Sequence, residues 1–153
     1  MKSIIAFTSA FLAALHLAAA APTVAARAET VSVSYDPKYD VRESSLTTVA
    51  CSDGENGLIP LGYSNFGSLP NFPNIGGAIT IPSWNSPNCG KCYQLHYSNG
   101  KIDKTINVLA IDAAPGGFNI GLQAMNTLTN GQAVQLGRIS ATYVAVDDSV
   151  CGM

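Results

Sequence analysis

Four cysteines constrain the fold of this 153-residue chain more than any other feature of its sequence. Cys51, Cys89, Cys92 and Cys151 are even in number, which is typical of structural disulfides in an exported chain. A Cys89–Cys92 bridge would constrain little. Pairing Cys51 with Cys89 and Cys92 with Cys151 closes two long loops, each contributing about 4 kcal/mol in the chain-entropy model. The residues leave a crossed pairing open, with Cys51 joined to Cys92 and Cys89 to Cys151.

The Cys89-Gly-Lys-Cys92 spacing also occurs in redox proteins. A thioredoxin-like motif follows a strand and opens a helix. Here Asn85-Ser-Pro-Asn88 precedes the motif, and strand-like residues 93–97 follow it. A zinc ribbon would use two close pairs, whereas Cys51 and Cys151 stand alone. We therefore expect no metal site and no cofactor.

The first residues indicate export. Lys2 precedes an apolar run, residues 4–17, that is too short to span a bilayer, and small residues follow. We predict a signal peptide over residues 1–20, with cleavage between there and residue 28. Residues 29–153 then form a single domain, secreted and without a membrane span.

Charge disfavours nucleic acid as a partner. From Glu29 onward the chain has six Lys and Arg residues against ten Asp and Glu residues, a net charge of −4. The charges are scattered, without a basic stripe.

The hydrophobic pattern predicts an all-β domain with short helices. Residues 104–111 are apolar on both faces, which is typical of a strand inside a closed sheet. Asn99-Gly100 predicts a type I′ turn between strands 92–97 and 104–111. The remaining expectations are strands 31–35, 78–81 and 138–146, a helix 46–50 capped by Ser44 or Ser45, and a helix 120–129 capped by Asn119 and ended by Gly131. With about six strands, the chain should form a small β-barrel.

The sequence holds no complete catalytic constellation. Once the signal peptide is removed, His96 is the one histidine, and its place in a strand favours a solvated side chain. Glycoside hydrolysis needs two carboxylates about 5–9.5 Å apart. Asp112, at the end of the apolar strand, is the natural first candidate, but no spacing pairs it with Asp36, Asp53, Glu55 or Asp147. We assign no catalytic residues.

Binding a sugar requires less than cleaving it. Asp112, Asn119 and Gln123 cluster around Gly116-Gly117, and the chain offers several aromatic rings for stacking: Tyr35, Tyr63, Phe66, Trp84 and Phe118. The alternative is that the aromatic residues form the core and the amides cap helices.

Seven segments occur in order along the chain: Val31-Ser-Val-Ser-Tyr-Asp36, Val49-Ala-Cys-Ser-Asp-Gly54, Cys89-Gly-Lys-Cys92, Val108-Leu-Ala-Ile-Asp112, Gly117-Phe-Asn-Ile120, Ala124-Met-Asn126 and Leu128-Thr-Asn-Gly131. Together they resemble the cerato-platanin family of small secreted fungal proteins. The resemblance implies a six-stranded double-psi β-barrel related to the first domain of expansins. It also implies the disulfides Cys51–Cys89 and Cys92–Cys151.

The same resemblance implies a function and a site. Family members bind chitin and N-acetylglucosamine oligomers in a shallow groove, loosen polysaccharide without established hydrolysis, and elicit plant defence. Asp112 carries over as the groove carboxylate, and we also predict groove contacts from Tyr35, Asp53, Asn119 and Gln123. The chain departs from the family pattern at Gly121-Leu122-Gln123, where acidic residues are common. That departure predicts weaker compensation of the helix dipole.

Three hypotheses follow. The first is a secreted, non-catalytic protein of the extracellular space and fungal cell wall, a monomer that binds chitin-type polysaccharide, loosens cellulose and meets a plant recognition component. The second is a weak glycan-cleaving or transglycosylating enzyme that uses Asp112. The third is an amphiphilic effector that coats surfaces and self-assembles at interfaces.

Overall fold

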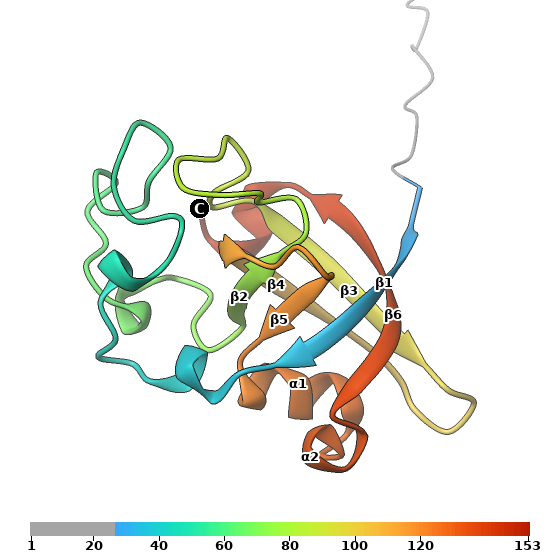
Figure 1. Ribbon diagram of the computed structural model, residues 1–153. Helices are drawn as coiled ribbons and strands as arrows, with labels where there is room; N and C mark the ends of the chain where they lie inside the picture. The colour runs from blue at the N-terminus through green and yellow to red at the C-terminus, as the bar shows by residue number, and fades with distance from the viewer. Residues whose placement is uncertain (1–26) are drawn as a thin grey trace, which may run out of the picture.

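Six strands close into a barrel in the computed structural model, which describes residues 27–153 (Figure 1). The predicted signal peptide lies outside the described residues. Around the barrel the order is β1-β5-β2-β4-β3-β6. The strands are β1 Glu29–Tyr35, β2 Ile75–Ala78, β3 Cys92–Ser98, β4 Asp103–Ala113, β5 Phe118–Ile120 and β6 Arg138–Val146. The prediction of a closed six-stranded barrel is confirmed.

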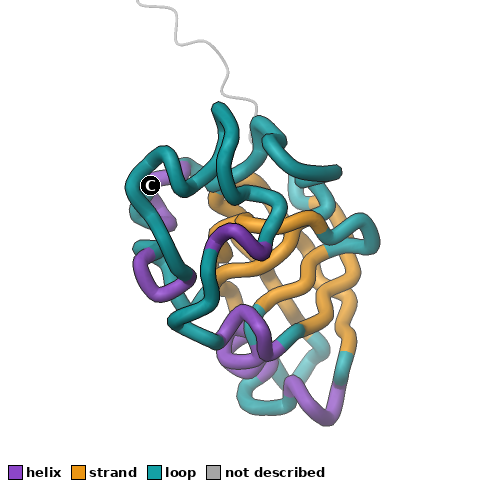
Figure 2. Tube along the Cα trace, turned by 60° about the vertical axis from the view of Figure 1, so that its left-hand side comes forward, coloured by secondary structure: helices purple, strands orange, loops and turns teal. Residues whose placement is uncertain are grey.

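Strand direction agrees with the double-psi topology that the resemblance implies. The pairs β1–β5 and β2–β4 are parallel, and the other four neighbouring pairs are antiparallel. Parallel neighbours need long connections, and the chain uses them. Most of residues 36–74 forms loops that Figure 2 shows wrapping beside the strands.

The helices are few and short. α1 and α2 lie together below the strands in the view of Figure 1, and α1 packs against β4. None of the helices within residues 27–153 is long and apolar enough to cross a membrane. Their bounds are α1 Leu122–Thr129, α2 Ala133–Leu136, and the 3₁₀ turns η1 Pro37–Asp40, η2 Leu46–Thr48, η3 Phe66–Ser68 and η4 Asp148–Cys151.

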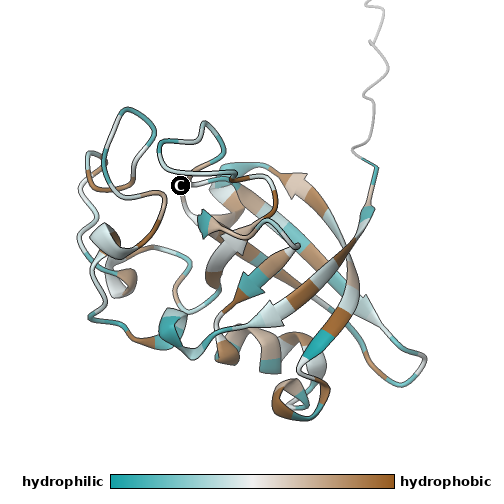
Figure 3. Cartoon of the chain, in the orientation of Figure 1, coloured by the Kyte–Doolittle hydropathy of each residue, from teal (hydrophilic) through white to brown (hydrophobic). Residues whose placement is uncertain are grey.

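Hydrophobic residues fill the barrel as the sequence pattern predicts. Hydrophobic and paler bands alternate along β1 (Figure 3), where Val31 and Val33 are buried. In β4, four consecutive residues from Val108 to Ile111 are fully buried, because α1 and η4 cover the face that does not point into the barrel. The prediction of a strand buried on both faces is confirmed.

Both disulfides join the pairs that the resemblance implies. Cys51 bonds to Cys89 and Cys92 to Cys151, with Cα–Cα distances of 5.4 and 5.6 Å. The two close cysteines therefore have different partners. Cys51–Cys89 fastens the loop after η2, and Cys92–Cys151 fastens the C-terminal turn to β3.

The predicted strand 78–81 is wrong by three residues, since β2 covers Ile75–Ala78. Glycine has low strand propensity, so the sequence pattern did not indicate a strand at Gly76 and Gly77. The neighbouring strand requires them: a Cβ at Gly76 would lie 2.4 Å from the carbonyl oxygen of Asn119. Beyond β2, the N–H of Ile81 donates to the carbonyl of Ala78 and closes a turn.

The hairpin between β3 and β4 is confirmed, but its predicted turn type is wrong. A type I′ turn requires positive φ at both central residues, and here Gly100 has a φ of 82° while Asn99 has a negative φ. Instead, Asn99 Oδ1 accepts the N–H groups of Lys101 and Ile102 at 3.1 and 2.8 Å. The Asn99 side chain therefore organises a longer loop.

The start of α1 also differs from its prediction. Asn119 lies in β5 and caps no helix, and α1 begins at Leu122. The Asp40 carboxylate of η1 accepts the N–H groups of Leu122 and Gln123 at 2.8 and 3.2 Å. An acidic group from a distant segment thus compensates the helix dipole at the position where the local sequence lacks one. Ser45 does cap η2, which ends at Thr48 rather than Ala50.

We predict that Asp40→Ala lowers the free energy of unfolding by about 1–2 kcal/mol, because two N–H groups at the start of α1 lose their acceptor. Urea unfolding followed by circular dichroism measures the change. Glu43→Ala is the matched control, since Glu43 is exposed and makes no hydrogen bond or ion pair within residues 27–153. Equal unfolding midpoints for Asp40→Ala and Glu43→Ala would contradict the capping role.

Candidate functional site

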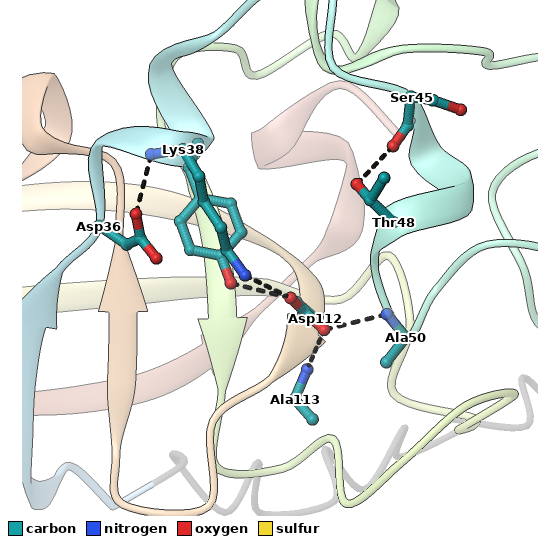
Figure 4. Close-up of polar contacts among 8 residues, drawn as sticks. Asp36, Lys38, Ser45, Thr48, Ala50, Asp112 and Ala113 are labelled. Atoms are coloured by element: carbon teal, nitrogen blue, oxygen red, sulfur yellow. Dashed lines mark hydrogen bonds and ion pairs between the residues drawn. The ribbon is translucent and has the colours of Figure 1, made fainter.

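Asp112 lies near the end of β4 and accepts four hydrogen bonds (Figure 4). Its Oδ2 accepts from Tyr39 Oη at 2.9 Å and from Lys38 Nζ at 3.3 Å. Its Oδ1 accepts the N–H groups of Ala50 and Ala113, both at 2.9 Å. The side chain of Asp112 is 15% exposed, so it lies at the edge of the surface.

These contacts make Asp112 a junction between segments. It ties η1 and the loop after η2 to the end of β4. An ionised carboxylate has about four acceptor positions, and the protein fills all of them here. A ligand hydroxyl could bind Asp112 by displacing Lys38, whose side chain is 48% exposed and whose contact is the longest of the four. Contact between Asp112 and a sugar remains a prediction.

Tyr39 is the buried donor of this junction. It is 1% exposed, packs against Phe66 with ring centroids 6.1 Å apart, and has Lys38 Nζ at 4.7 Å from its ring centroid. Burial, followed by the negative charge of Asp112, raises the pKa of Tyr39. The hydroxyl therefore keeps its proton and donates to Asp112.

Asn119 lies on the same row of the barrel as Asp112. Both residues pair with Gly77 of β2, one on each side, and Asn119 also pairs with Ser34, which pairs with Arg138. Side chains in lateral register share a face of a sheet. The row therefore places Arg138, Ser34, Asn119 and Asp112 in one line across the barrel.

A pocket of about 250 Å³ opens along this row. Ser34 Oγ donates to Asn119 Oδ1 at 3.1 Å in its wall, and Arg138 Nη1 donates to Ser32 Oγ at 2.8 Å. Asp112 does not line the pocket, but it is the residue immediately before Ala113, which does. The lining residues are Ser34, Ala113, Ala114, Pro115, Gly116, Gly117, Phe118, Asn119 and Arg138.

The other predicted groove residues lie outside this pocket. Tyr35 ends β1 and is partly buried, and Gln123 is exposed in the first turn of α1. Asp53 lies on the loop after Cys51, where its Oδ1 accepts from Trp84 Nε1 at 2.7 Å. That hydrogen bond, followed by one from Ser52, lowers the pKa of Asp53. Sugar contacts from these three residues remain predictions.

Three other side chains considered for catalysis, Asp36, His96 and Asp147, each have a polar partner in the structure. His96 Nε2 lies 2.9 Å from Asp103 Oδ1 on the surface of the hairpin. Asp147 accepts from the N–H of Ser149 and caps η4. The negative charge of Asp36, like that of Asp112, raises the pKa of Tyr39. Asp36 Oδ1 also accepts the N–H of Lys38. Within residues 27–153, no three His, Cys, Asp or Glu side chains are grouped to hold a metal ion.

Sequence reasoning missed Tyr39, Lys38 and two pocket residues, Ser34 and Arg138. The sequence did contain a signal for Ser34, because alternation along β1 places its side chain on the face opposite to that of the buried Val33. No comparable signal marked Tyr39, since Asp36-Pro37 indicated only the end of a strand.

Comparison with known proteins places this geometry in a family. Residues 31–153 match the cerato-platanin family. Allergen Asp f 15 of Aspergillus fumigatus is 58% identical over 136 residues, covering 88% of this chain and 86% of that protein. The crystal structure of cerato-platanin 2 from M. perniciosa has a TM-score of 0.78 at 44% identity, covering 82% of this chain and all of that one. The solution structure of the fungal elicitor cerato-platanin has a TM-score of 0.68 at 37% identity, covering 79% and 96%.

The Tyr39–Asp112 hydrogen bond predicts a specific pH dependence. Tyr39→Phe should lower the free energy of unfolding by about 1 kcal/mol at neutral pH. Because folding raises the pKa of Tyr39 above its ordinary value of 10.0, this group stabilises the folded state fully below pH 10 and progressively less above it. The difference between wild type and Tyr39→Phe should therefore shrink between neutral pH and about pH 11.

Urea unfolding at both pH values measures the difference. Tyr63→Phe is the control, since the hydroxyl of Tyr63 makes no side-chain hydrogen bond within residues 27–153. If the difference in the free energy of unfolding between wild type and Tyr39→Phe stays constant with pH, the hydrogen bond from Tyr39 to Asp112 is contradicted.

Proposed function

The chain belongs to the cerato-platanin family, and on that premise we propose that it is a secreted, non-catalytic protein that binds chitin and N-acetylglucosamine oligomers. Secretion follows the family, whose members are secreted fungal proteins. The ligand class and the absence of catalysis are our inference from the pocket and from Asp112.

The pocket carries the proposal for carbohydrate binding. Its wall offers an amide, a hydroxyl and a guanidinium group, which match the hydroxyl and N-acetyl groups of the sugar. Asn119 Oδ1 is occupied by Ser34, while Asn119 Nδ2 has no hydrogen-bond partner within residues 27–153. That Nδ2 is available to donate to an N-acetyl carbonyl. Open space surrounds the position where a Cβ on Gly116 would lie, which leaves room in the wall for a sugar ring.

Asp112 supports binding without cleavage. A glycosidase uses one carboxyl group to protonate the leaving oxygen and a second to activate water or attack the sugar. Four donors occupy both oxygens of Asp112, so it would have to lose one of them before acting as an acid or a nucleophile. This geometry favours a positioning role that holds the loops beside the pocket.

Recognition by plants is part of the proposal. One solved relative is titled a fungal elicitor, and we propose that this chain likewise elicits plant defence. Leaf infiltration tests this part: folded protein should trigger a defence response, and reduced, unfolded protein should not. Equal responses to both preparations would contradict recognition of the fold.

Binding and cleavage are separated in one experiment. We expect the oxidised protein without its signal peptide to bind insoluble chitin while releasing no reducing ends. Asn119→Ala should weaken binding about fivefold, the equivalent of one hydrogen bond of about 1 kcal/mol. Cellulose, incubated in parallel, tests whether binding extends to a polysaccharide without N-acetyl groups. The bound fraction and the reducing ends are measured over time.

The controls assign each outcome to one hypothesis. Gln135→Ala changes an exposed amide on α2 that does not line the pocket, and this variant should bind like wild type. Reducing ends that accumulate with wild type and vanish with Asp112→Ala would establish the glycan-cleaving alternative. Failure to bind either polymer would contradict the proposed function and favour the surface-coating alternative.

A further inference from the structure

Trp84 is an exposed aromatic residue that is held in place. It is the single tryptophan of the chain, and 57% of it is exposed. Its Nε1 donates to Asp53 Oδ1 at 2.7 Å. Gly54 leaves room for the indole ring, because a Cβ at Gly54 would lie 2.9 Å from Trp84 Cζ2. The indole therefore lies close over the backbone of the loop that carries Asp53.

The loop that carries Trp84 is fastened just after the indole, at Asn85 and at Cys89. The backbone N–H of Asn56 donates to Asn85 Oδ1 at 2.8 Å, and Asn56 Nδ2 donates to the carbonyl of Asn85 at 3.0 Å. Asn85 adopts a left-handed conformation with a φ of 58°, which asparagine tolerates better than most residues. The Cys51–Cys89 disulfide joins the same two loops. An exposed aromatic ring thus has a defined position, although no regular element holds it.

From this geometry we infer that Trp84 and Asp53 form a second contact for the polysaccharide, in which the indole face stacks on a neutral sugar ring. The inference rests on the proposed function and extends its site. Because Asp53 satisfies the indole N–H, the apolar ring face is the part of Trp84 left for a ligand. Asp53 Oδ2 makes no hydrogen bond within residues 27–153 and can accept from a hydroxyl of the stacked sugar.

Charge favours a neutral sugar over other occupants of this surface. Asp53 and the neighbouring Glu55 are both exposed and acidic. They would repel an acidic polysaccharide or an anionic lipid surface. Chitin-type chains are uncharged and present the alternating apolar ring faces and hydroxyl groups that the pair Trp84 and Asp53 can contact.

Trp84 lies close enough to the Asp112 junction for one polymer chain to contact both. The N–H of Ala50 is bound to Asp112, and Asp53 is three residues further along. Three residues of extended chain span at most about 11 Å between Cα atoms. Longer oligomers should therefore bind more tightly than short ones, because they can reach Trp84 and the Asp112 junction together.

The fluorescence of this single tryptophan provides a direct test. We expect chitohexaose to change the emission of Trp84 saturably and to protect it from quenching by acrylamide, with weaker effects from chitobiose. Trp84→Ala should weaken chitohexaose binding about fivefold to tenfold, and Trp84→Phe should retain part of the affinity. Asp53→Ala should weaken binding by releasing the indole. Leu61→Ala is the matched control, since Leu61 is an exposed apolar residue outside the loop that carries Trp84.

Each outcome distinguishes this inference from the function on which it rests. Calorimetry measures the affinity of every variant, and urea unfolding confirms that each is folded. If chitohexaose binds equally to wild type and Trp84→Ala and leaves the emission unchanged, the inference is overturned while the proposed function stands. If wild type does not bind chitohexaose at all, both are overturned. An emission change caused by anionic phospholipid vesicles, but by no oligosaccharide, would overturn the inference and indicate that Trp84 contacts a membrane surface instead of a sugar.

Discussion

The hydrogen-bonded carboxylate of Asp112 joins the end of β4 to two segments that lie more than sixty residues earlier in the chain. Its partners come from η1, from the loop after η2 and from the end of β4 itself. A partly buried carboxylate is costly unless its oxygens find donors, and here η1 and the loop after η2 supply three of the four donors, Lys38, Tyr39 and Ala50. The charge that the strand brings to the surface therefore determines where the loops lie.

The loops depend on such specific contacts because they contain little regular structure. Between η2 and β3, the Cys51–Cys89 disulfide, the hydrogen bonds between Asn56 and Asn85, and the Asp53–Trp84 hydrogen bond replace a sheet or helix. Loops held on a rigid scaffold are common places for binding residues. The barrel supplies the row from Arg138 to Asp112, and the loops hold Trp84 in a defined position.

Local patterns in the sequence predicted those parts of the fold that depend on local physics. Alternation predicted β1, and two-sided hydrophobicity predicted β4, because burial of each side chain is encoded at its own position. β2 was predicted three residues too late and β5 was not predicted, because their reasons are tertiary: Gly76 is required by the approach of Asn119 from another strand. Asp40 illustrates the same limit. It caps α1 from a segment more than eighty residues earlier, and no local rule relates the two.

The same limit applies to the candidate site, where sequence could select residues but could not assign their roles. Asp112 and Asn119 could be selected from sequence as polar residues beside a glycine turn, but their roles differ in a way that only geometry shows. Asn119 has an amide nitrogen directed at no partner within the described residues and belongs to the pocket lining. Asp112 has four partners and lies just outside that lining. A proton placed on either oxygen of Asp112 would face a donor, so acid catalysis would require the junction itself to open. The contacts of Asp112 therefore hold the loops beside the pocket, whereas Asn119 keeps an amide donor in the pocket wall without a partner in the described residues.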